Sequence, residues 1–500
     1  MRHTIQILTT AIVALACWGC NRQLPQAEAV NSQPVIFPDY CGVTVPCNIA
    51  PLNFRTDTTA EAIAVFACAG KEEGRFRLSS ADGSFRIPQR KWRRLLSEAQ
   101  GDSLLVTLYQ LVQGQWKRYA PFAIHVSADS IDTYMAYRLI PPAYRMWGEM
   151  GIYERCLENF EEEAFLTNRL MNNNCMNCHS FCMQDPDRML FHQRSTHGGT
   201  YLIQQGRIEK LDTKTDKTIS AFVYPSWHPS GRYVAFSTND IKQDYHFSDT
   251  NRIEVFDQAS DVIVYDVERH EVLTDSLLMS ANRFETFPTF SPDGQTLYFC
   301  SAEARSMPEE YDQVRYSLVG IPFDAAHGTF GTEVDTLFDA PHEKLSAHFP
   351  RVSPDGRRLL FTVSAYGNFS IWHRDADLRM IDLSTGATND MEDVNSHEAE
   401  SYHSWSSNSR WFVFSSRRDD GLYTRPYICH LSPDGKPAKP FELPQAAPDF
   451  YDHLLLSYNI PEFVRGKVRV DKRELMRVSK YGTAGKVGIS YWAGQTEAFP

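Results

Sequence analysis

Between residues 224 and 414 the chain contains four copies of one pattern of hydrophobic and polar residues. Each copy begins with an aromatic residue, passes through a turn of the Ser-Pro-Asp-Gly type and ends in an apolar run closed by Phe. The copies are Tyr224–Arg232, Phe287–Gln295, Phe349–Arg357 and Tyr402–Arg410, and the closing residues are Phe236, Phe299, Phe361 and Phe414. This order predicts a short inner strand joined by a tight turn to a buried strand.

The copies recur at intervals of 63, 62 and 53 residues. Further strand-like runs, such as Asp261–Asp266 and Leu378–Leu383, fill the intervals. Intervals of this length suit four-stranded units with loops, and a series of such units is typical of a β-propeller.

The earlier stretch Cys182–Phe191 has the same spacing as these copies. Cys182 lies nine residues before Phe191, which makes it the start of a fifth unit, 45 residues before Trp227, and puts His179 at the position of Tyr224. A sixth unit could come from Ala447–Val464 or from the preceding linker. We therefore expect an all-β chain with a propeller of five to six blades over residues 175–464.

The segment before the propeller is expected to hold a separate β-rich domain. Leu104–Tyr109 and Pro121–Val126 are strand-like, and Gln113–Gln115 between them suits a hairpin turn. These runs predict a β-sandwich-like domain over residues 39–133 that carries no chemical motif.

Two segments differ in character from these β-rich parts. Residues 134–174 contain Pro141-Pro142 and an acidic patch at 158–163, and we predict a partly helical linker. Residues 465–500 form a basic C-terminal segment, in which 465–486 hold eight Lys or Arg against two acids. That charge could complement the acidic patch, face anionic lipid headgroups or be solvated.

The N-terminus is typical of a secretory signal. An apolar run, Ile5–Trp18, follows Arg2 and His3 and is too short for a stable membrane span. Small residues precede Cys17 and Cys20, as in a bacterial lipobox, so residues 1–20 are expected to be a lipoprotein signal with one of these two cysteines lipidated. An ordinary signal peptide is the alternative. Residues 21–38 are polar and contain proline, which indicates a tether.

The strongest chemical motif is Cys175-Met176-Asn177-Cys178-His179, a C-x-x-C-H sequence. In c-type haem attachment, two such thiols form thioethers with the haem vinyl groups, and the following His binds the iron. We therefore predict one covalent haem c, held by Cys175 and Cys178, with His179 as proximal ligand at one mouth of the propeller channel.

Other uses of these cysteines stay open. A zinc site would need a further Cys or His pair, a thioredoxin-like pair would need a βαβ setting, and a structural disulfide needs neither. The spacing to Cys182 matches no ferredoxin pattern. Candidates for the second iron ligand are Met183, His192, His348 and His403, and the sixth coordination position could also be open.

The Ser-Pro-Asp-Gly units resemble the TolB-like (PD40) propeller family over roughly residues 180–450. The whole chain resembles a group of Bacteroidota lipoproteins that combine a β-rich N-terminal segment, one C-x-x-C-H motif and this propeller. The chain departs from the pattern at Ser407-Asn408-Ser409, where Pro-Asp-Gly is expected. Those lipoproteins tend to carry an acidic run after the lipidated Cys when they face outward; Asn21-Arg22-Gln23 lacks one, which favours a periplasm-facing anchor.

Composition narrows the functional class. The net charge of −12 argues against a general nucleic-acid binder. No Gly-rich phosphate loop, G-x-S-x-G elbow or H-E-x-x-H motif is present in the sequence, so no catalytic residue is predicted. Eleven cysteines are too few for a disulfide-dense scaffold.

The expected function is electron transfer or redox sensing by a lipid-anchored monohaem protein with an unknown redox or protein partner in the periplasm. The alternatives are a binding scaffold, in which the haem is structural or absent, and a haem enzyme with an open sixth position.

Overall fold

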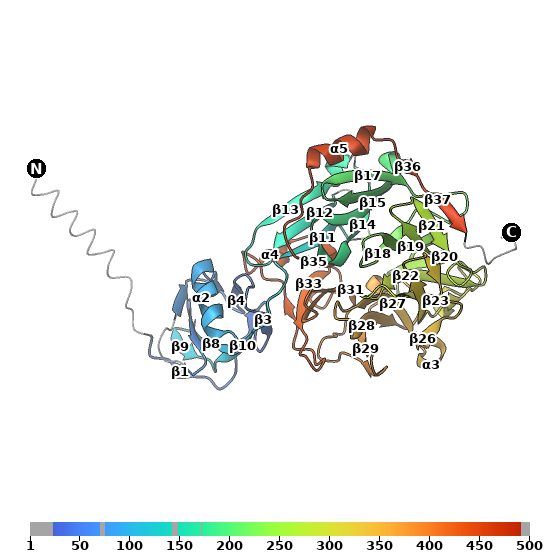
Figure 1. Cartoon of the computed structure of the whole chain (residues 1–500). Helices are drawn as coiled ribbons and strands as arrows, with labels where there is room; N and C mark the ends of the chain where they lie inside the picture. The colour runs from blue at the N-terminus through green and yellow to red at the C-terminus, as the bar shows by residue number, and fades with distance from the viewer. Residues whose placement is uncertain (1–23, 71–75, 143–148, 172, 492–500) are drawn as a thin grey trace, which may run out of the picture.

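The computed structural model describes residues 24–70, 76–142, 149–171 and 173–491 (Figure 1). The expected signal peptide, with Cys17 and Cys20, lies outside the described residues. The described chain is mostly β-structure arranged in many sheets, as the sequence predicts. No helix among the described residues is long and apolar enough to cross a membrane.

The N-terminal region combines two sheets and one helix. A seven-stranded sheet has the order β1-β9-β8-β10-β3, with β5 paired to β8 and β6 paired to β5, and a smaller sheet has the order β2-β4-β7. Its strands are β1 (Glu28–Ala29), β2 (Ile36–Phe37), β3 (Thr44–Pro46), β4 (Phe54–Thr56), β5 (Ala62–Cys68), β6 (Phe76–Ser80), β7 (Ser84–Phe85), β8 (Ser103–Val112), β9 (Gln115–Arg118) and β10 (Phe122–Ser127).

The expected strands of this region are confirmed as β8 and β10, which pair antiparallel. The turn at Gln113-Gly114 instead joins β8 to the short strand β9, so the predicted hairpin partner was wrong. Helix α2 (Gln89–Ala99) was not predicted, although its apolar residues recur at helical spacing. Trp92, Leu95, Leu96 and Ala99 are buried and face the sheet at β5 and β8.

Six sheets of four or five strands form the rest of the chain, and we number them in the order of their first strands. Sheet 1 is β14 (Met176–Phe181), β15 (Arg188–Gln193), β16 (Gly199–Gln204) and β17 (Arg207–Asp212); sheet 2 is β18 (Val223–Trp227), β19 (Tyr233–Tyr245), β20 (Ile253–Asp266) and β21 (Glu271–Thr274); sheet 3 is β22 (Arg283–Phe290), β23 (Thr296–Glu303), β24 (Ser317–Asp324), β25 (Thr329–Phe330) and β26 (Asp335–Phe338).

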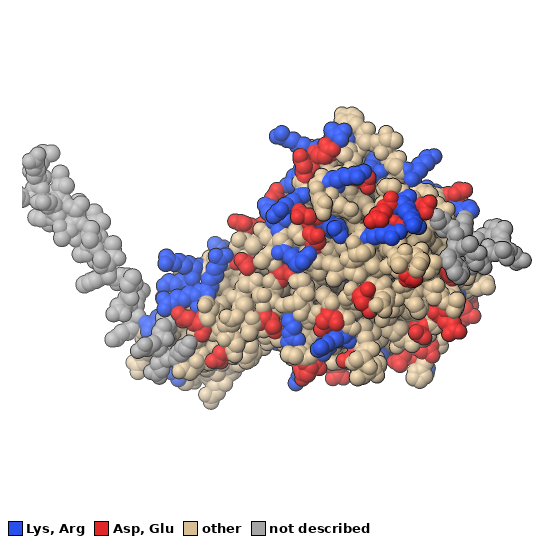
Figure 2. All heavy atoms as spheres, in the orientation of Figure 1, with Lys and Arg blue, Asp and Glu red and all other residues tan. Residues whose placement is uncertain are grey.

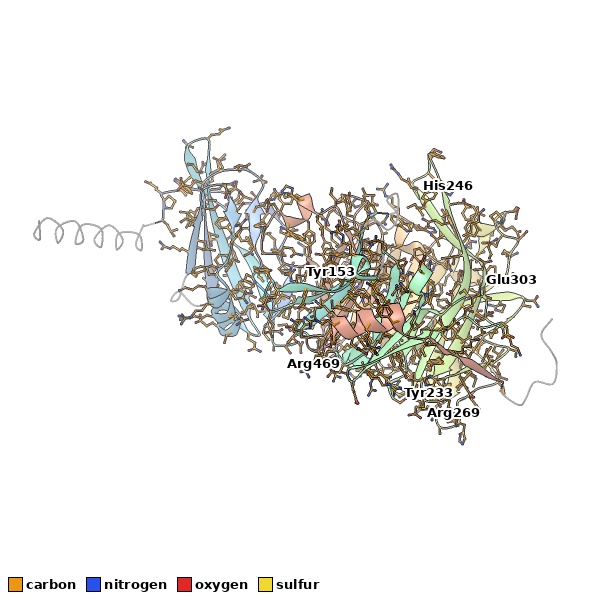
Figure 3. The ribbon with its side chains drawn as sticks, turned by 90° about the horizontal axis from the view of Figure 1, so that it is seen from above. Tyr153, Tyr233, His246, Arg269, Glu303 and Arg469 are labelled. Carbon is orange, nitrogen blue, oxygen red and sulfur yellow. The ribbon has the colours of Figure 1, made fainter. Side chains whose placement is uncertain are left out.

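Sheet 4 is β27 (Ser346–Val352), β28 (Arg358–Ser364), β29 (Asp377–Asp382) and β30 (Thr388–Asn389); sheet 5 is β31 (Glu400–Trp405), β32 (Trp411–Ser416), β33 (Arg425–His430) and β34 (Phe441–Glu442); sheet 6 is β35 (Ser457–Val464), β11 (Tyr134–Ile140), β12 (Gly151–Cys156) and β13 (Glu162–Thr167). The short helices α3 (Ala340–Glu343) and α4 (Phe450–His453) lie in connections. The hairpin β19–β20 is longer than the others, and Figure 3 shows His246 at its outer end.

Sheet 6 corrects the expectation for residues 134–174. This segment is not a partly helical linker, because it supplies β11, β12 and β13, and its only helical part among the described residues is the single turn Asn168–Met171. The first strand of the sheet, β35, comes from the opposite end of the chain and pairs antiparallel with β11. Both segments that were considered for a sixth unit therefore contribute to it.

Neighbouring sheets pack through apolar side chains. Leu190 and Leu202 of sheet 1 share a buried cluster with Val234 and Phe236 of sheet 2, and similar clusters join the later sheets. The first strands β14, β18, β22, β27, β31 and β35 each contact the next, and β35 contacts β14.

The turns after the first strands explain the Ser-Pro-Asp-Gly signature. Ser291 donates to Asp293, whose carboxylate accepts the backbone N–H of Gln295. Gly294 has a φ of +74°, and a Cβ there would lie 2.1 Å from the imidazole of His228, so glycine is required on both counts. In sheet 5, Ser409 adopts a φ of 59° at the equivalent place.

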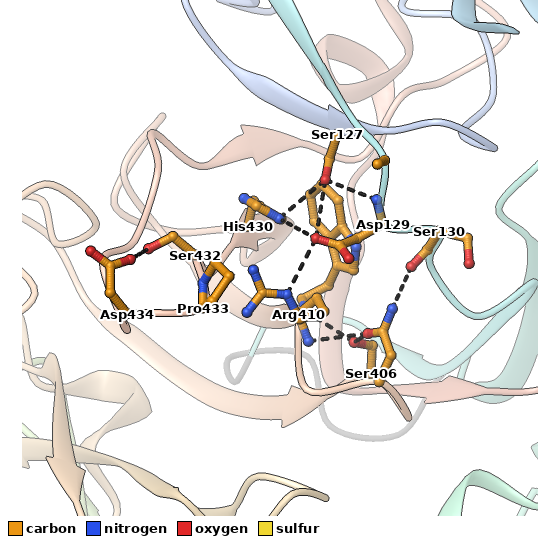
Figure 4. Close-up of polar contacts among 12 residues, drawn as sticks. Ser127, Asp129, Ser130, Ser406, Arg410, His430, Ser432, Pro433 and Asp434 are labelled. Atoms are coloured by element: carbon orange, nitrogen blue, oxygen red, sulfur yellow. Dashed lines mark hydrogen bonds and ion pairs between the residues drawn. The ribbon is translucent and has the colours of Figure 1, made fainter. Parts of the chain in front are cut away.

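The N-terminal region contacts sheet 5 through polar side chains (Figure 4). The carboxylate of Asp129 accepts hydrogen bonds from His430, at 3.1 Å, and from Arg410, at 3.2 Å. Asp132 similarly accepts from the backbone and hydroxyl groups of Ser407. The departure Ser407-Asn408-Ser409 thus lies where this turn meets the N-terminal region.

The basic C-terminal segment folds back over the first two sheets. It forms helix α5 (Lys472–Tyr481) and strands β36 (Gly485–Lys486) and β37 (Gly488–Tyr491), which add in parallel to β17 and β21. Lys467 lies 3.0 Å from Glu163, and Lys472 also forms an ion pair with that carboxylate. The sequence left open whether the basic segment pairs with the acidic patch, faces lipid headgroups or is solvated. Lys467 and Lys472 pair with the acidic patch.

Candidate functional site

A matching β-bulge interrupts the first strand of all six sheets. In each case two residues stand opposite one residue of the neighbouring strand. The first bulge residue has a φ between 46° and 53° and is Cys178, Tyr224, Phe287, Phe349, Tyr402 or Ile460. The second is His179, Pro225, Pro288, Pro350, His403 or Pro461.

These bulges correct the predicted alignment by one residue. Cys178, and not His179, occupies the position of Tyr224. Tyr224 precedes Phe236 by 12 residues, whereas Cys178 precedes Phe191 by 13. The extra residue is accommodated in the turn Cys182–Gln184, where Met183 and Gln184 both have positive φ angles.

The first bulge residues line a cavity between the six first strands. Four of them form a chain of aromatic contacts, with centroid separations of 4.6 Å for Tyr224–Phe287, 4.2 Å for Phe287–Phe349 and 4.7 Å for Phe349–Tyr402. Cys178 and Ile460 complete the lining. We call these six residues the aromatic belt. It gives the thiol of Cys178 an apolar, water-poor environment.

His179 is the least satisfied polar side chain of this site. It is 2% exposed, and neither ring nitrogen has a hydrogen bond of good geometry with a described residue, although the backbones of Ile460 and Ala136 lie close enough to interact with the ring. Burial lowers the pKa of His179 to about 3, nearby Arg138 adds to the shift, and the backbones of Ile460 and Ala136 oppose it. The imidazole is therefore neutral at physiological pH.

The three clustered cysteines are buried and not joined by disulfides. Burial raises the pKa of the Cys178 thiol, and the backbone of Tyr224 partly offsets the shift. Cys182 donates to the carbonyl oxygen of His228 at 3.8 Å. Burial also raises the pKa of Cys182, and thiols with raised pKa values are not reactive nucleophiles.

Two cavities adjoin the motif and share Tyr224 in their linings. The central one, about 120 Å³, is lined by the aromatic belt together with His179, Arg351, His403 and Glu462. The larger one, about 660 Å³, lies between sheets 1 and 2 and is lined by His192, Arg194 and Lys210, among others. The N–H of Arg194 bonds to the carbonyl oxygen of Cys175 at 3.0 Å, so the larger cavity borders the start of the motif.

The donor set fits a c-type haem. It contains two reduced thiols and a neutral imidazole without a well-formed hydrogen bond, in C-x-x-C-H order. Cys178 and His179 line the central cavity, which alone is below the roughly 300 Å³ at which cofactor pockets begin. The larger cavity is within the usual range of cofactor pockets but is not lined by the residues of the motif.

The candidates for a second iron ligand lie at different places. His348 and His403 are buried, and their Nε2 atoms are 2.8 Å from the hydroxyl of Ser364 and the carbonyl oxygen of Leu360. Met183 is 37% exposed, beyond the far end of β14. His192 contacts Thr200 through Nδ1 and lines the larger cavity, and its Nε2 makes no hydrogen bond with the described residues. His192 therefore faces the larger cavity, whereas His403 lines the central cavity together with His179. The Nδ1 atoms of His348 and His403 are likewise without a well-formed hydrogen bond among the described residues.

The charged segment Arg417-Arg418-Asp419-Asp420, which follows β32, is engaged within the fold. Asp420 pairs with Arg425, Asp419 accepts from Tyr427, and Arg417 stacks on Trp372 at 3.8 Å. Within the described ranges, no group of three or more His, Cys, Asp or Glu side chains is arranged to hold a metal ion.

No family model and no curated protein matches the chain. Solved structures with partial similarity include a puromycin-hydrolysing peptidase of Mycobacterium tuberculosis (10% identity, 84% of this chain, 57% of that chain, TM-score 0.34). A prolyl endopeptidase (13%, 63%, 42%, 0.35) and dipeptidyl peptidase 4 of Porphyromonas gingivalis (10%, 69%, 58%, 0.28) also match. The chain spans about half the length of these structures, and similarity at this level identifies no shared activity.

Proposed function

We propose that the six sheets are the blades of a closed β-propeller whose two ends meet in sheet 6. The matching bulges, the apolar clusters between neighbouring sheets and the successive contacts of the first strands support this architecture. Pairing of β35 with β11 would join the beginning of the ring to its end. The proposal agrees with the resemblance to TolB-like propellers.

We propose that this protein carries one haem c, bound through Cys175 and Cys178, with His179 as the proximal ligand, and that it transfers electrons or senses redox state. The proposal rests on the burial of the His179 imidazole without a well-formed hydrogen bond. A buried imidazole without a well-formed hydrogen bond is unfavourable unless something binds it. His179 directly follows two buried, reduced cysteines in the order that haem attachment requires.

The chain's own residues would prepare this site in three ways. Burial keeps His179 unprotonated, so its lone pair is available at neutral pH. The aromatic belt excludes water around Cys178. Arg194 and Lys210 supply positive charge beside the larger cavity, although Asp212 and Asp240 also line it. A bound haem c would supply one-electron exchange between ferrous and ferric iron.

The proposed location is the periplasmic face of a membrane, through a lipid on Cys17 or Cys20. This location agrees with covalent haem attachment, which retains the cofactor outside the cytoplasm. The partner would be a redox protein or another periplasmic protein.

Haem staining of the denatured protein tests the proposal. The full chain is produced in a host that attaches c-type haem, and we expect a stained band and about one haem per chain. Cys175→Ser with Cys178→Ser should abolish staining, whereas Cys41→Ser, which removes a half-buried cysteine of the N-terminal region, should not. Wild-type protein without covalent haem would contradict the proposal.

The polar cavity of about 660 Å³ favours a second candidate, a ligand- or protein-binding scaffold without functional haem. Unstained, correctly folded protein would support that candidate. A haem enzyme is distinguished by its spectrum, because a ferric state that responds to cyanide or peroxide indicates an open iron position.

A further inference from the structure

A concentration of exposed positive charge lies on the described part of the N-terminal region. Arg86, Arg90, Lys91 and Arg93 are exposed within eight residues, on α2 and just before it. Figure 2 shows a continuous blue area over the N-terminal region, whereas the rest of that view carries both acidic and basic groups. We call these four residues the α2 basic surface.

None of these four charges forms an ion pair within 4 Å among the described residues, although hydrogen bonds, with a smaller contribution from Arg86, lower the pKa of Asp82. Arg94, the next basic residue, pairs with Glu98 at 2.6 Å. Arg86, Arg90 and Arg93 have no carboxylate within 4 Å among the described residues, and Lys91 lies 5.8 Å from the ring centre of Phe76.

The position of these charges also opposes helix stability. The positive end of the helix dipole lies at the N-terminus, where acidic side chains are favourable and basic ones unfavourable. Helix α2 has no acidic residue in its first turn and no basic residue in its last turn. In a chain with a net charge of −12, this arrangement is better explained by an external anionic partner than by local stability.

The path of the chain brings the proposed lipid anchor close to this surface. Only seven residues separate Cys20 from β1, and about eight residues of extended chain reach at most roughly 28 Å. β1 is two strands from β8 in the sheet that α2 covers, a lateral distance of about 10 Å. A lipidated Cys20 would therefore hold this region next to the bilayer.

We propose that the α2 basic surface binds the phosphate headgroups of an anionic phospholipid bilayer and orients the protein on it. Guanidinium groups form paired hydrogen bonds with phosphate oxygens, and each Lys or Arg near such a surface strengthens membrane association by about fivefold. The orientation uses the proposed lipid anchor, but headgroup binding itself does not depend on the lipid or on haem.

Vesicle sedimentation tests this surface directly. The chain from Asn21, which contains every described residue but no lipid, is mixed with phosphatidylcholine vesicles or with vesicles containing 30% phosphatidylglycerol. We expect binding only to the anionic vesicles and its loss in 0.5 M salt. Arg86→Gln with Arg90→Gln and Arg93→Gln should weaken the binding at least tenfold.

The matched control replaces three exposed arginines elsewhere, Arg207, Arg269 and Arg305, with Gln and should bind like the wild type. Figure 3 shows Arg269 on the opposite side of the molecule from the N-terminal region. Equal binding to both vesicle types, or equal loss in the two triple variants, would overturn the proposal. Haem staining is unaffected by either result, so this failure is distinguishable from failure of the haem proposal.

Discussion

Cys178 and Tyr224 occupy the same place in successive strands, each as the first residue of a β-bulge, with φ angles of 53° and 51°. A cysteine of the C-x-x-C-H motif thus takes the position that four other strands give to an aromatic ring. The motif is therefore part of the repeated architecture and not an insertion beside it. His179 then occupies the second bulge position, which holds proline in four of the other strands and histidine in the fifth.

Replacing His179 with Pro should preserve the fold and remove the iron ligand. Pro225, Pro288 and Pro350 show that this bulge accepts proline after a residue with positive φ. We expect the free energy of unfolding to change by no more than about 1 kcal/mol, since proline also restricts the unfolded chain. Urea denaturation measures the stability, and the absorption spectrum measures the ligand. A strongly destabilised variant would show that His179 has a structural role that the prolines do not share.

Replacing Phe287 with Ala should open the aromatic belt. Phe287 is buried and contacts Tyr224 and Phe349 within it. Removing a buried phenyl ring costs about 3–5 kcal/mol through lost burial and the cavity left behind. Urea denaturation measures the loss, and Phe247→Ala, which truncates a fully exposed side chain, is the control with no expected effect.

Glu285 should make stability fall as the pH rises. Burial raises the pKa of Glu285 to about 8, with nearby Asp261 adding to the shift. The unfolded state releases its proton near pH 4.5 while the folded state keeps it, so the folded form loses relative stability between about pH 4.5 and 8. Glu285→Gln removes this dependence, and its stability relative to wild type should increase from pH 5 to pH 8.

Urea denaturation at several pH values measures that trend. Glu303→Gln changes an exposed carboxylate at the outer end of β23 and serves as the control. A constant difference between Glu285→Gln and the wild type at all pH values would contradict the assignment.

Glu163 should hold the C-terminal segment against sheet 6 above acidic pH. Hydrogen bonds and ion pairs with Lys472 and Lys467 lower its pKa to about 2. The contribution is present above about pH 4.5 and is lost as the pH falls toward 2. Because the groups are half exposed, Glu163→Gln should cost no more than about 1 kcal/mol, and less in high salt. Faster proteolysis within residues 465–471 would report the release, and Glu161→Gln, an exposed neighbour, should leave the rate unchanged.

Local patterns were sufficient where a structure depends on nearby residues. The Ser-Pro-Asp-Gly turns, the strands before and after them, and the strands β8 and β10 were all predicted, because turn chemistry and alternation act over a few residues. Helix α2 also had a local signal in its apolar spacing, and its omission was an error of interpretation. The sequence likewise shows the C-x-x-C-H order directly.

Other features depend on residues that are far apart in the chain. The pairing of β35 with β11 joins segments more than 300 residues apart, and neither segment shows this by itself. The one-residue error at Cys178 arose because an extra residue in the turn at Met183 is visible only when the strands pair. The sequence alone determined that two thiols and an imidazole lie within five consecutive residues, because the covalent backbone fixes their order. Only the tertiary structure decided that His179 is buried and neutral, because those properties come from the strands that surround it.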